Sequence, residues 1–403
     1  IKLGKNIDRS DNPKIRLKNM IRVALGQSKM VVRPIAGILH IIVYAGFIII
    51  NIEVLEIIID GVFGTHRVFS FLGSFYNFLI GSFEILAILV LLSVIIYLTR
   101  RNIIKIKRFY NSEMKGWPSL DANLILIFEI FLMSAFLLMN TSDLILQNRG
   151  FYEAAGYFPI SSLIAPFFTD FSTEFLIFIE RFSWWFHIIG IFAFLNYLVI
   201  SKHLHILFAF PNTYYANLKP KGQLNNLDSV TNEIKIMMDP NNDPYSNNEV
   251  NTVPERFGAK DINDLNWVQI LNAYTCTECG RCTSECPANI TGKKLSPRKI
   301  MMDVRDRVEE YGRNIDNNVS DEKSLLNDYI TTEELWACTT CNACTEACPI
   351  NIDPLSIIVD LRRYLVMEES AAPNELNMMF SNIENNGAPW QFSSSDRLNW
   401  KDE

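Results

Sequence analysis

Long apolar runs dominate the first half of the chain, whereas polar and apolar residues mix over short intervals in the second half. Four of these runs are long enough for membrane helices, since a helix needs about 20 mostly apolar residues to cross a bilayer. We expect these helices at about 34–59, 71–98, 122–146 and 173–201. A soluble bundle is the alternative, but a small domain cannot bury four such runs. The pattern therefore predicts a four-helix membrane domain over 34–205.

Basic residues are distributed unevenly among the segments that flank the predicted spans. Lys and Arg number nine in residues 1–33 and six in 99–120, but only one each in 60–72 and 147–172. An excess of Lys and Arg marks cytoplasmic segments. We therefore expect a multi-pass protein of the bacterial cytoplasmic (inner) membrane, with its N-terminal and C-terminal segments in the cytoplasm. Because the chain begins with Ile1 rather than Met, we also expect it to be truncated.

All eight cysteines fall into two groups with the same internal spacing. The run "CTECGRCTSECP" begins at residue 276 and "CTTCNACTEACP" begins at residue 338. This is the spacing of bacterial two-cluster ferredoxins, in which the fourth cysteine of each run ligates the other 4Fe–4S cluster. We assign cluster one to Cys276, Cys279, Cys282 and Cys348, and cluster two to Cys338, Cys341, Cys344 and Cys286.

The sequence around the cysteines indicates helices rather than strands. Ser296 and Pro297 are typical of a helix N-terminus, and Thr331 with Glu334 forms a capping box. The fold class predicted for the whole chain is therefore all-α, a transmembrane helix bundle followed by a cytoplasmic α-helical ferredoxin domain. After the membrane domain, the expected parts are a linker over 206–256, a dicluster ferredoxin domain over 257–370 and a tail over 371–403.

Spacing and composition argue against several other classes of protein. Zinc prefers two cysteine pairs and has no use for a third cysteine at this spacing. Disulfide frameworks suit small secreted domains rather than a chain of 403 residues. The net charge of −7 and the lack of a basic repeat argue against nucleic acid as the partner. No G-x-G-x-x-G fingerprint indicates a dinucleotide domain.

Histidines in the membrane half suggest haem ligands. His40 lies near the cytoplasmic end of the first span. His187 and His205 are 18 residues apart, or five helical turns, and would share one face of a fourth helix that runs through both. We expect His40 and His205 to be the axial ligands of a haem b, with Arg33 and Lys202 beside its propionates.

Other membrane residues have weaker signals. His203 competes with His205, but on a helix it would point about 160° away. A possible second haem would use His187 and His66, which lies in an outer loop. Charged groups at bilayer depth are costly and often functional, so Glu84 and Glu129 are candidates for carrying protons to a quinone. The alternative for these two carboxylates is a hydrogen bond inside the bundle.

The membrane half resembles the cytochrome b subunit of respiratory nitrate reductase and the membrane subunit of heterodisulfide reductase. The resemblance rests on His40 with "GF" at 46–47, on "WWFH" at 184–187 and on "SKHLH" at 201–205. The soluble half resembles the small iron–sulfur subunit of heterodisulfide reductase, including the tail "NNGAPWQFSSSDRLNW" at 385–400.

One position departs from this resemblance. The nitrate reductase subunit has a second histidine ten residues after the one that His40 matches, whereas this chain has Ile50 there. The departure weakens the case for an outer haem.

The resemblance implies a membrane-bound electron-transfer subunit of a quinone-linked oxidoreductase. Two 4Fe–4S clusters and haem b would pass electrons between a cytoplasmic partner and a quinone, expected to be menaquinone. The implied partner is a heterodisulfide-reductase-like subunit with CCG domains, fed by an electron-transferring flavoprotein or a dehydrogenase, and the substrate chemistry would lie there. Two alternatives stay open: quinol oxidation that drives cytoplasmic disulfide reduction, and a membrane scaffold in which the clusters are structural.

The tail offers a docking site for such a partner. Trp390, Arg397 and Trp400 stand in a segment with few aliphatic core residues, and Trp and Arg are common interface anchors. A disordered C-terminus is the alternative.

Overall fold

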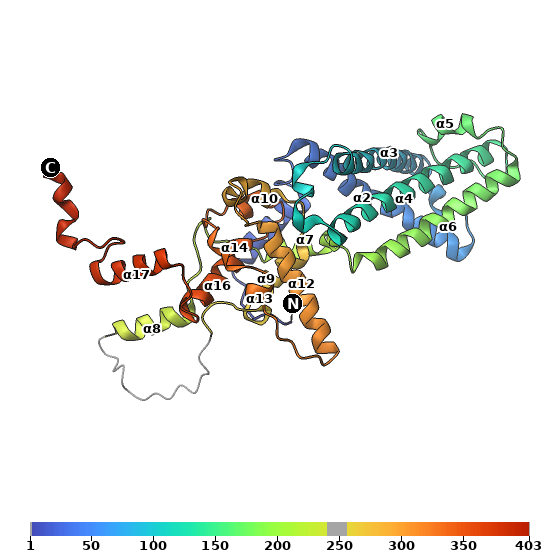
Figure 1. Cartoon of the computed structure of the whole chain (residues 1–403). Helices are drawn as coiled ribbons and strands as arrows, with labels where there is room; N and C mark the ends of the chain where they lie inside the picture. The colour runs from blue at the N-terminus through green and yellow to red at the C-terminus, as the bar shows by residue number, and fades with distance from the viewer. Residues whose placement is uncertain (1, 240–255, 403) are drawn as a thin grey trace.

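The computed structural model describes residues 2–239 and 256–402. The protein is elongated, with a helical membrane bundle, a helical domain that carries the cysteines and an extended C-terminal segment along its length (Figure 1). The structure is 68% helical, and the described residues contain isolated bridges but no strands. The prediction of an all-α fold is confirmed.

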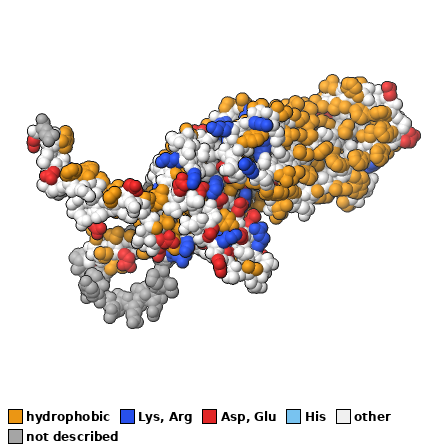
Figure 2. All heavy atoms as spheres, in the orientation of Figure 1, with side chains coloured by type: hydrophobic (Ala, Val, Ile, Leu, Met, Phe, Trp, Pro, Cys, Tyr) orange, Lys and Arg blue, Asp and Glu red, His pale blue; other side chains and the backbone are white. Residues whose placement is uncertain are grey.

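Four long apolar helices form the membrane bundle. They are α2 (Pro34–Phe63), α3 (Ser74–Asn102), α4 (Trp117–Asn148) and α6 (Thr173–Leu198). In sequence order α2 packs on α3, α3 on α4, and α4 on α6, while α2 and α6 touch only lightly. Figure 2 shows apolar side chains over the visible face of this end of the molecule and charged side chains over the middle. The lipid-facing surface and the four predicted spans therefore coincide.

The fourth membrane helix ends earlier than the sequence predicts. Asp121 of α4 accepts hydrogen bonds from the Tyr197 hydroxyl (2.5 Å), the Ser201 hydroxyl (2.7 Å) and the Lys202 amide (3.1 Å). These bonds stabilise a turn after Leu198, because a side-chain acceptor satisfies backbone N–H groups outside the helix. The expectation of one helix that carries His187 and His205 on a shared face is therefore wrong.

The chain continues from this turn into the soluble domain without a flexible linker at that point. A 3-10 turn, η6 (Lys202–Leu204), leads into α7 (His205–Tyr214). Helix α7 packs on the cysteine-bearing domain, where Asn212 donates to the carbonyl of Ile350 at 2.7 Å. Residues 206–214, expected at the start of a linker, are thus part of the folded junction. Much of the later part of the expected linker lies outside the described residues.

Short helices occupy the other connections of the membrane half. They are η2 (Val68–Leu72), η3 (Lys107–Phe109), η4 (Ser112–Met114), α5 (Ser161–Ile164) and η5 (Ala165–Phe167).

The cysteine-bearing domain is built from short helices around one core. They are η7 (Ile262–Asp264), α9 (Trp267–Thr275), α10 (Arg281–Glu285), α11 (Pro287–Ile290), α12 (Pro297–Asp316), α13 (Leu325–Asp328), α14 (Thr332–Trp336), α15 (Ala343–Ala347) and α16 (Pro354–Met367). Two predicted helix starts are confirmed: Ser296 accepts from the Lys299 amide, and Thr331 with Glu334 forms a reciprocal capping box. Side chains from α9, α12 and α16 fill the apolar core.

The basic N-terminal segment folds onto this domain. It contains α1 (Pro13–Met20) and a π-helical turn, η1 (Ile21–Leu25). Arg16 is buried and donates to the carbonyls of Tyr214 (3.2 Å) and Ala216 (3.0 Å). Lys5 donates its backbone N–H to Leu265 at 2.7 Å. The segment 1–33 therefore belongs to the soluble fold and lies at the same end of the membrane bundle as the 99–120 loop.

Three helical pieces project from the far side of the soluble domain. They are α8 (Asp228–Met238), α17 (Asn374–Asn386) and the 3-10 segment η8 (Ser394–Lys401), and the last two lead away from the body of the protein (Figure 1).

Candidate electron-transfer site

The two cysteine loops have the same backbone conformation. Glu278 and Gly280 in the first loop have φ of 56° and 70°, and Thr340 and Asn342 in the second have φ of 55° and 61°. Such left-handed positions turn the chain sharply, and Gly or Asn adopts them at the lowest cost. Each loop then enters a short helix, and these two helices, α10 and α15, pack against each other. The repeated spacing therefore folds into two related loops that face a shared interior.

The loops bring cysteines from both sequence groups together. One cavity is lined by the first three cysteines of the first group and by Cys344 and Cys348 of the second. In the other loop, Cys286 and Cys341 both lie within electrostatic reach of Cys338. None of the eight cysteines forms a disulfide, so all eight side chains are available as cluster ligands. Across both described ranges, no three Cys, His, Asp or Glu side chains converge tightly enough for a single metal ion.

The buried thiols have the donor chemistry that an iron–sulfur cluster needs. Burial raises the pKa of Cys276 and Cys344 to about 12, and that of Cys348 to about 11. The thiolate is the form that ligates iron, so cluster binding must displace these protons. The mixed set of cysteines around each loop fits clusters that share ligands across the two groups.

Buried ion pairs hold the first cysteine loop against the membrane domain. Glu278, 2% exposed, pairs with Lys202 at the end of the membrane bundle and with Arg305 at 2.9 Å. Arg298, fully buried, pairs with Glu113 of the 99–120 loop at 2.7 Å. Loss of one partner from such a buried pair typically costs about 3–5 kcal/mol, because the other charge is left uncompensated. The junction is therefore a specific, rigid contact.

This junction also engages the two cations that we expected beside the haem propionates. Lys202 pairs with Glu278, and Arg33 pairs with Glu285 at 2.7 Å and bonds Ser284 at 2.8 Å. Both side chains link the membrane domain to the first cysteine loop, so the structure gives them another role.

Three histidines gather at the same end of the membrane bundle. The rings of His203 and His205 lie 5.3 Å apart, and His40 on α2 is within electrostatic reach of both. The Nδ1 atom of His40 is buried without a hydrogen-bond partner, whereas Nδ1 of His205 lies 3.2 Å from the Lys202 carbonyl. The expectation that His203 points away from His205 is wrong, because these residues lie on a 3-10 turn and not on a continuous α-helix.

The protonation state of His203 and His205 suits iron ligation. Burial lowers the pKa of His203 to about 3 and that of His205 to about 4. Both are therefore neutral imidazoles near pH 7, the form that binds a metal. A carbonyl that holds Nδ1 of His205 leaves its Nε2 atom for a ligand. His205 and the unpartnered nitrogen of His40 therefore have the donor chemistry that a haem iron would need.

The structure does not bring His66 and His187 together. His187 is bonded through Nδ1 to the carbonyl of Leu132 at 3.0 Å. His66 lies 3.4 Å from Asp143 and stacks on Tyr152. Leu132 and Asp143 are eleven residues apart on α4, which is about 16 Å along the helix axis. One haem iron cannot span that separation, so the possible second haem with these two ligands is contradicted.

The two candidate proton carriers differ in their surroundings. Glu84 is buried and accepts from the amides of Ile160 (2.9 Å) and Ser161 (3.1 Å) and from the Ser161 hydroxyl. It therefore fixes the outer connection between α4 and α6, the alternative considered for such a carboxylate. Glu129 is half-buried on α4 and forms no hydrogen bond or ion pair with any other residue that the structure describes.

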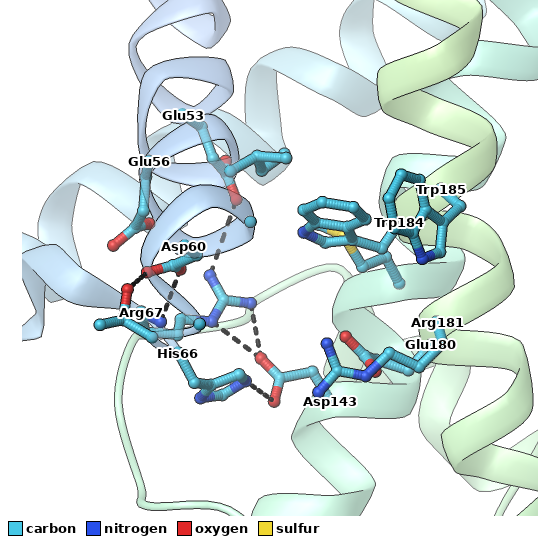
Figure 3. A pocket seen from close by; sticks show the side chains of 15 residues that line it. Glu53, Glu56, Asp60, His66, Arg67, Asp143, Glu180, Arg181, Trp184 and Trp185 are labelled. Atoms are coloured by element: carbon cyan, nitrogen blue, oxygen red, sulfur yellow. Dashed lines mark hydrogen bonds and ion pairs between the residues drawn. The ribbon is translucent and has the colours of Figure 1, made fainter.

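A polar cavity at the opposite end of the membrane bundle was not predicted. It has a volume of about 250 Å³. Figure 3 shows the side chains of α2, α4, α6 and the outer loop that surround it. We call it the distal cavity and define it by Glu53, His66, Arg67, Asp143, Trp184 and Trp185. In the sequence, the acidic residues Glu53 and Glu56 near the end of the first span are the signal for this site. The apolar pattern of that span alone places both residues at the membrane interface.

The tail presents aromatic side chains to solvent. Trp390 and Phe392 are exposed, and Trp400 is 72% exposed. Arg397 is also exposed. The structure leaves these residues free for a partner.

Comparison with known proteins agrees with the cysteine geometry. A family model described as a 4Fe-4S dicluster domain matches residues 275–352. The chain is therefore an iron–sulfur protein with a dicluster domain, related to oxidoreductases and to heterodisulfide reductase subunits.

Two relatives match almost the whole chain. The "Probable iron-sulfur-binding oxidoreductase FadF" of Bacillus subtilis is 31% identical over 100% of this chain and 57% of its own length. The "EtfAB:quinone oxidoreductase" of Syntrophomonas wolfei is 28% identical over 98% of this chain and 55% of its own length. The chain thus spans little more than half the length of these curated relatives.

A shorter match covers about a quarter of the chain. One subunit of the ferredoxin- and F(420)H(2)-dependent CoB-CoM heterodisulfide reductase of Methanosarcina acetivorans is 35% identical over 26% of this chain and 52% of its own length. No solved structure matches the chain.

Proposed function

We propose that this chain transfers electrons between a redox partner on its cysteine side and a quinone in the membrane. The proposed carriers are two 4Fe–4S clusters, with the crossed ligands assigned above, and a haem b held by His40 and His205. The observation that carries the proposal is that the first cysteine loop and the histidine cluster meet at one end of the bundle, where Lys202 joins them: it pairs with Glu278 and lies three residues before His205.

Residues of the chain would hold the electron carriers and fix their relative positions. When bound, clusters and haem supply one-electron carriers. The buried pairs Lys202–Glu278 and Arg298–Glu113 fix the cysteine loop on the membrane domain, so the distance between carriers stays constant. His40 and His205 would supply the two nitrogen ligands of the haem iron. An iron with two such ligands has no open position, which favours electron transfer over oxygen chemistry.

The distribution of basic residues supports an orientation of the protein in the membrane, and the comparisons support a quinone as its substrate. The excess of Lys and Arg in 1–33 and 99–120 supports a cytoplasmic cysteine side in a bacterial inner membrane. The similarity to the EtfAB:quinone oxidoreductase of Syntrophomonas wolfei supports a quinone as the membrane substrate. We propose menaquinone, in line with the resemblance to the nitrate reductase subunit.

A reductive titration of the purified protein in lipid nanodiscs tests this function. Optical and EPR detection should show two 4Fe–4S clusters and one low-spin haem b. After removal of excess reductant, a naphthoquinone should reoxidise all three centres. A protein that lacks haem by a pyridine haemochrome assay, or whose reduced centres persist with quinone, would contradict the proposal.

We also propose that the tail docks a soluble partner, a CCG-domain subunit like that of heterodisulfide reductase or an electron-transferring flavoprotein. Exposed Trp390, Arg397 and Trp400 support this role. Deletion of 385–403 should abolish co-purification of the partner while the EPR signals of both clusters stay unchanged. A complex that survives the deletion would show that the partner binds elsewhere.

A further inference from the structure

We propose that the quinone headgroup binds in the distal cavity and exchanges protons with Glu53. The proposal rests on the quinone-linked function above and adds where the substrate binds. In this proposal Glu53 takes the proton-carrying role that we expected for Glu84 and Glu129.

Glu53 is buried away from hydrogen-bond donors. The residue is 2% exposed, and neither of its carboxylate oxygens has a hydrogen-bond partner. Its nearest opposite charge is Arg67, at 3.6 Å. A buried carboxylate without hydrogen bonds is costly, so a ligand that bonds it, or a proton that neutralises it, stabilises the site.

Neighbouring acids do not share this state. Glu56 accepts from the Tyr76 hydroxyl and from the Phe69 amide, both at 2.9 Å. Asp143 is held by Arg67 at 2.6 Å. Figure 3 shows Glu53 beside Arg67, on the side of the guanidinium away from Asp143. Asp143 Oδ1 also has no hydrogen bond but lies 3.4 Å from His66 Nε2, so Glu53 is the acid lining this cavity with neither oxygen hydrogen-bonded.

The lining of the cavity combines flat apolar surface with N–H donors. Trp184 and Trp185 provide flat apolar surface on α6, opposite the polar side chains of the outer loop. His66 and Arg67 carry N–H groups that can donate to a carbonyl oxygen. A quinone headgroup needs this combination, because it is a flat ring with two carbonyl acceptors that become hydroxyl groups on reduction.

The cavity is accessible from the bilayer. The cavity lies between α2 and α6, which touch only lightly. Trp185 at its rim is 57% exposed, on a surface that would face lipid. Gly61 of α2 allows the close approach of Trp184, since a Cβ atom there would meet the indole at 2.7 Å. A lipid-soluble molecule can therefore enter sideways between the two helices.

The position of the cavity sets the path of electrons and protons. Glu53 is thirteen residues after His40 on α2, about 20 Å along the helix axis. Reduction of one quinone takes two electrons, delivered one at a time from the cysteine side, and two protons. Glu53 gives one proton to a quinone oxygen and regains one from water at the outer end, and water from the same end supplies the second proton to the other oxygen. Quinol oxidation reverses each transfer.

Three variants test the site in nanodisc-embedded full-length protein. Trp184→Leu removes the ring wall, Gly61→Ala pushes the indole from its place, and Glu53→Gln keeps the shape but cannot release a proton. Binding is measured with 2-heptyl-4-hydroxyquinoline N-oxide, a fluorescent quinone analogue. Turnover is measured as reoxidation of the reduced centres by menadione. Glu174→Gln is the control, because it removes an exposed carboxylate of α6 that does not line the cavity.

We expect Trp184→Leu and Gly61→Ala each to weaken analogue binding at least tenfold. Glu53→Gln should retain binding within about threefold and slow reoxidation at least tenfold. Glu174→Gln should resemble the wild type, and the EPR signals of the clusters, which report folding, should be unchanged in all variants.

Other outcomes separate the two proposals. Wild-type binding and reoxidation in every cavity variant would overturn the site and leave the quinone-linked function intact. Failure of the wild-type protein to react with menadione would overturn both. Calcium that raises the melting temperature of the wild type but not of Glu53→Gln, with analogue binding unaffected, would identify a cation site instead.

Discussion

Replacement of His40 or His205 by alanine should remove the low-spin b-haem spectrum completely, whereas replacement of His66 should leave it intact. His40 presents a buried nitrogen without a partner, and the Lys202 carbonyl orients the His205 ring. Loss of either imidazole leaves the iron five-coordinate, which produces a high-spin spectrum or loss of haem. Optical spectra of the reduced protein and the haemochrome assay measure the effect.

Two further histidine variants sharpen this test. His203→Ala should retain the low-spin haem, with at most a shift in its midpoint potential, because the Lys202 carbonyl orients the ring of His205, and His203 only packs beside that ring. His187→Ala should also retain it, since His187 packs on α4 at another depth. If His203→Ala abolishes the haem and His205→Ala does not, the ligand assignment must be exchanged between these two.

Serine at Cys286 should eliminate cluster two and spare cluster one, and serine at Cys348 should do the reverse. The prediction follows from the crossed arrangement, in which Cys348 lines the cavity of the first loop and Cys286 lies near Cys338. Both cysteines are buried, directly follow a five-residue helix and stand before a proline. The two variants are therefore matched controls for each other.

EPR spectra of the dithionite-reduced variants, together with iron analysis, measure this pair. We expect about four iron atoms to be lost in each variant, the content of one cubane cluster. Equal loss of both signals in both variants would contradict crossed ligation, provided that the haem spectrum and the helical circular dichroism show an intact fold.

Local signals in the sequence predicted much of this protein. The four spans follow from apolar runs of sufficient length, because lipid requires every backbone polar group to be satisfied within the helix itself. The helix starts at Ser296 and Thr331 follow from side chains that bond amides three residues away. The cysteine groups follow from a spacing that ligand geometry imposes. Each of these features depends on neighbours in the chain.

Long-range contacts decided the rest. The end of the fourth helix depends on Asp121, which lies far from Leu198 in sequence and next to its last turn in space. The role of Lys202 depends on Glu278 in another domain. The distal cavity joins Glu53, Arg67 and Trp184 from separate segments.

The sequence by itself determined the membrane spans, the dicluster motif and the all-α class, because periodicity, length and local capping are properties of consecutive residues. Only the tertiary structure decided which buried charges are satisfied and which remain available. Glu84 is bonded to the outer connection, whereas Glu53 has no hydrogen bond. The energy of a buried carboxylate depends on the groups that packing brings to it, and the pattern along one helix does not specify those groups.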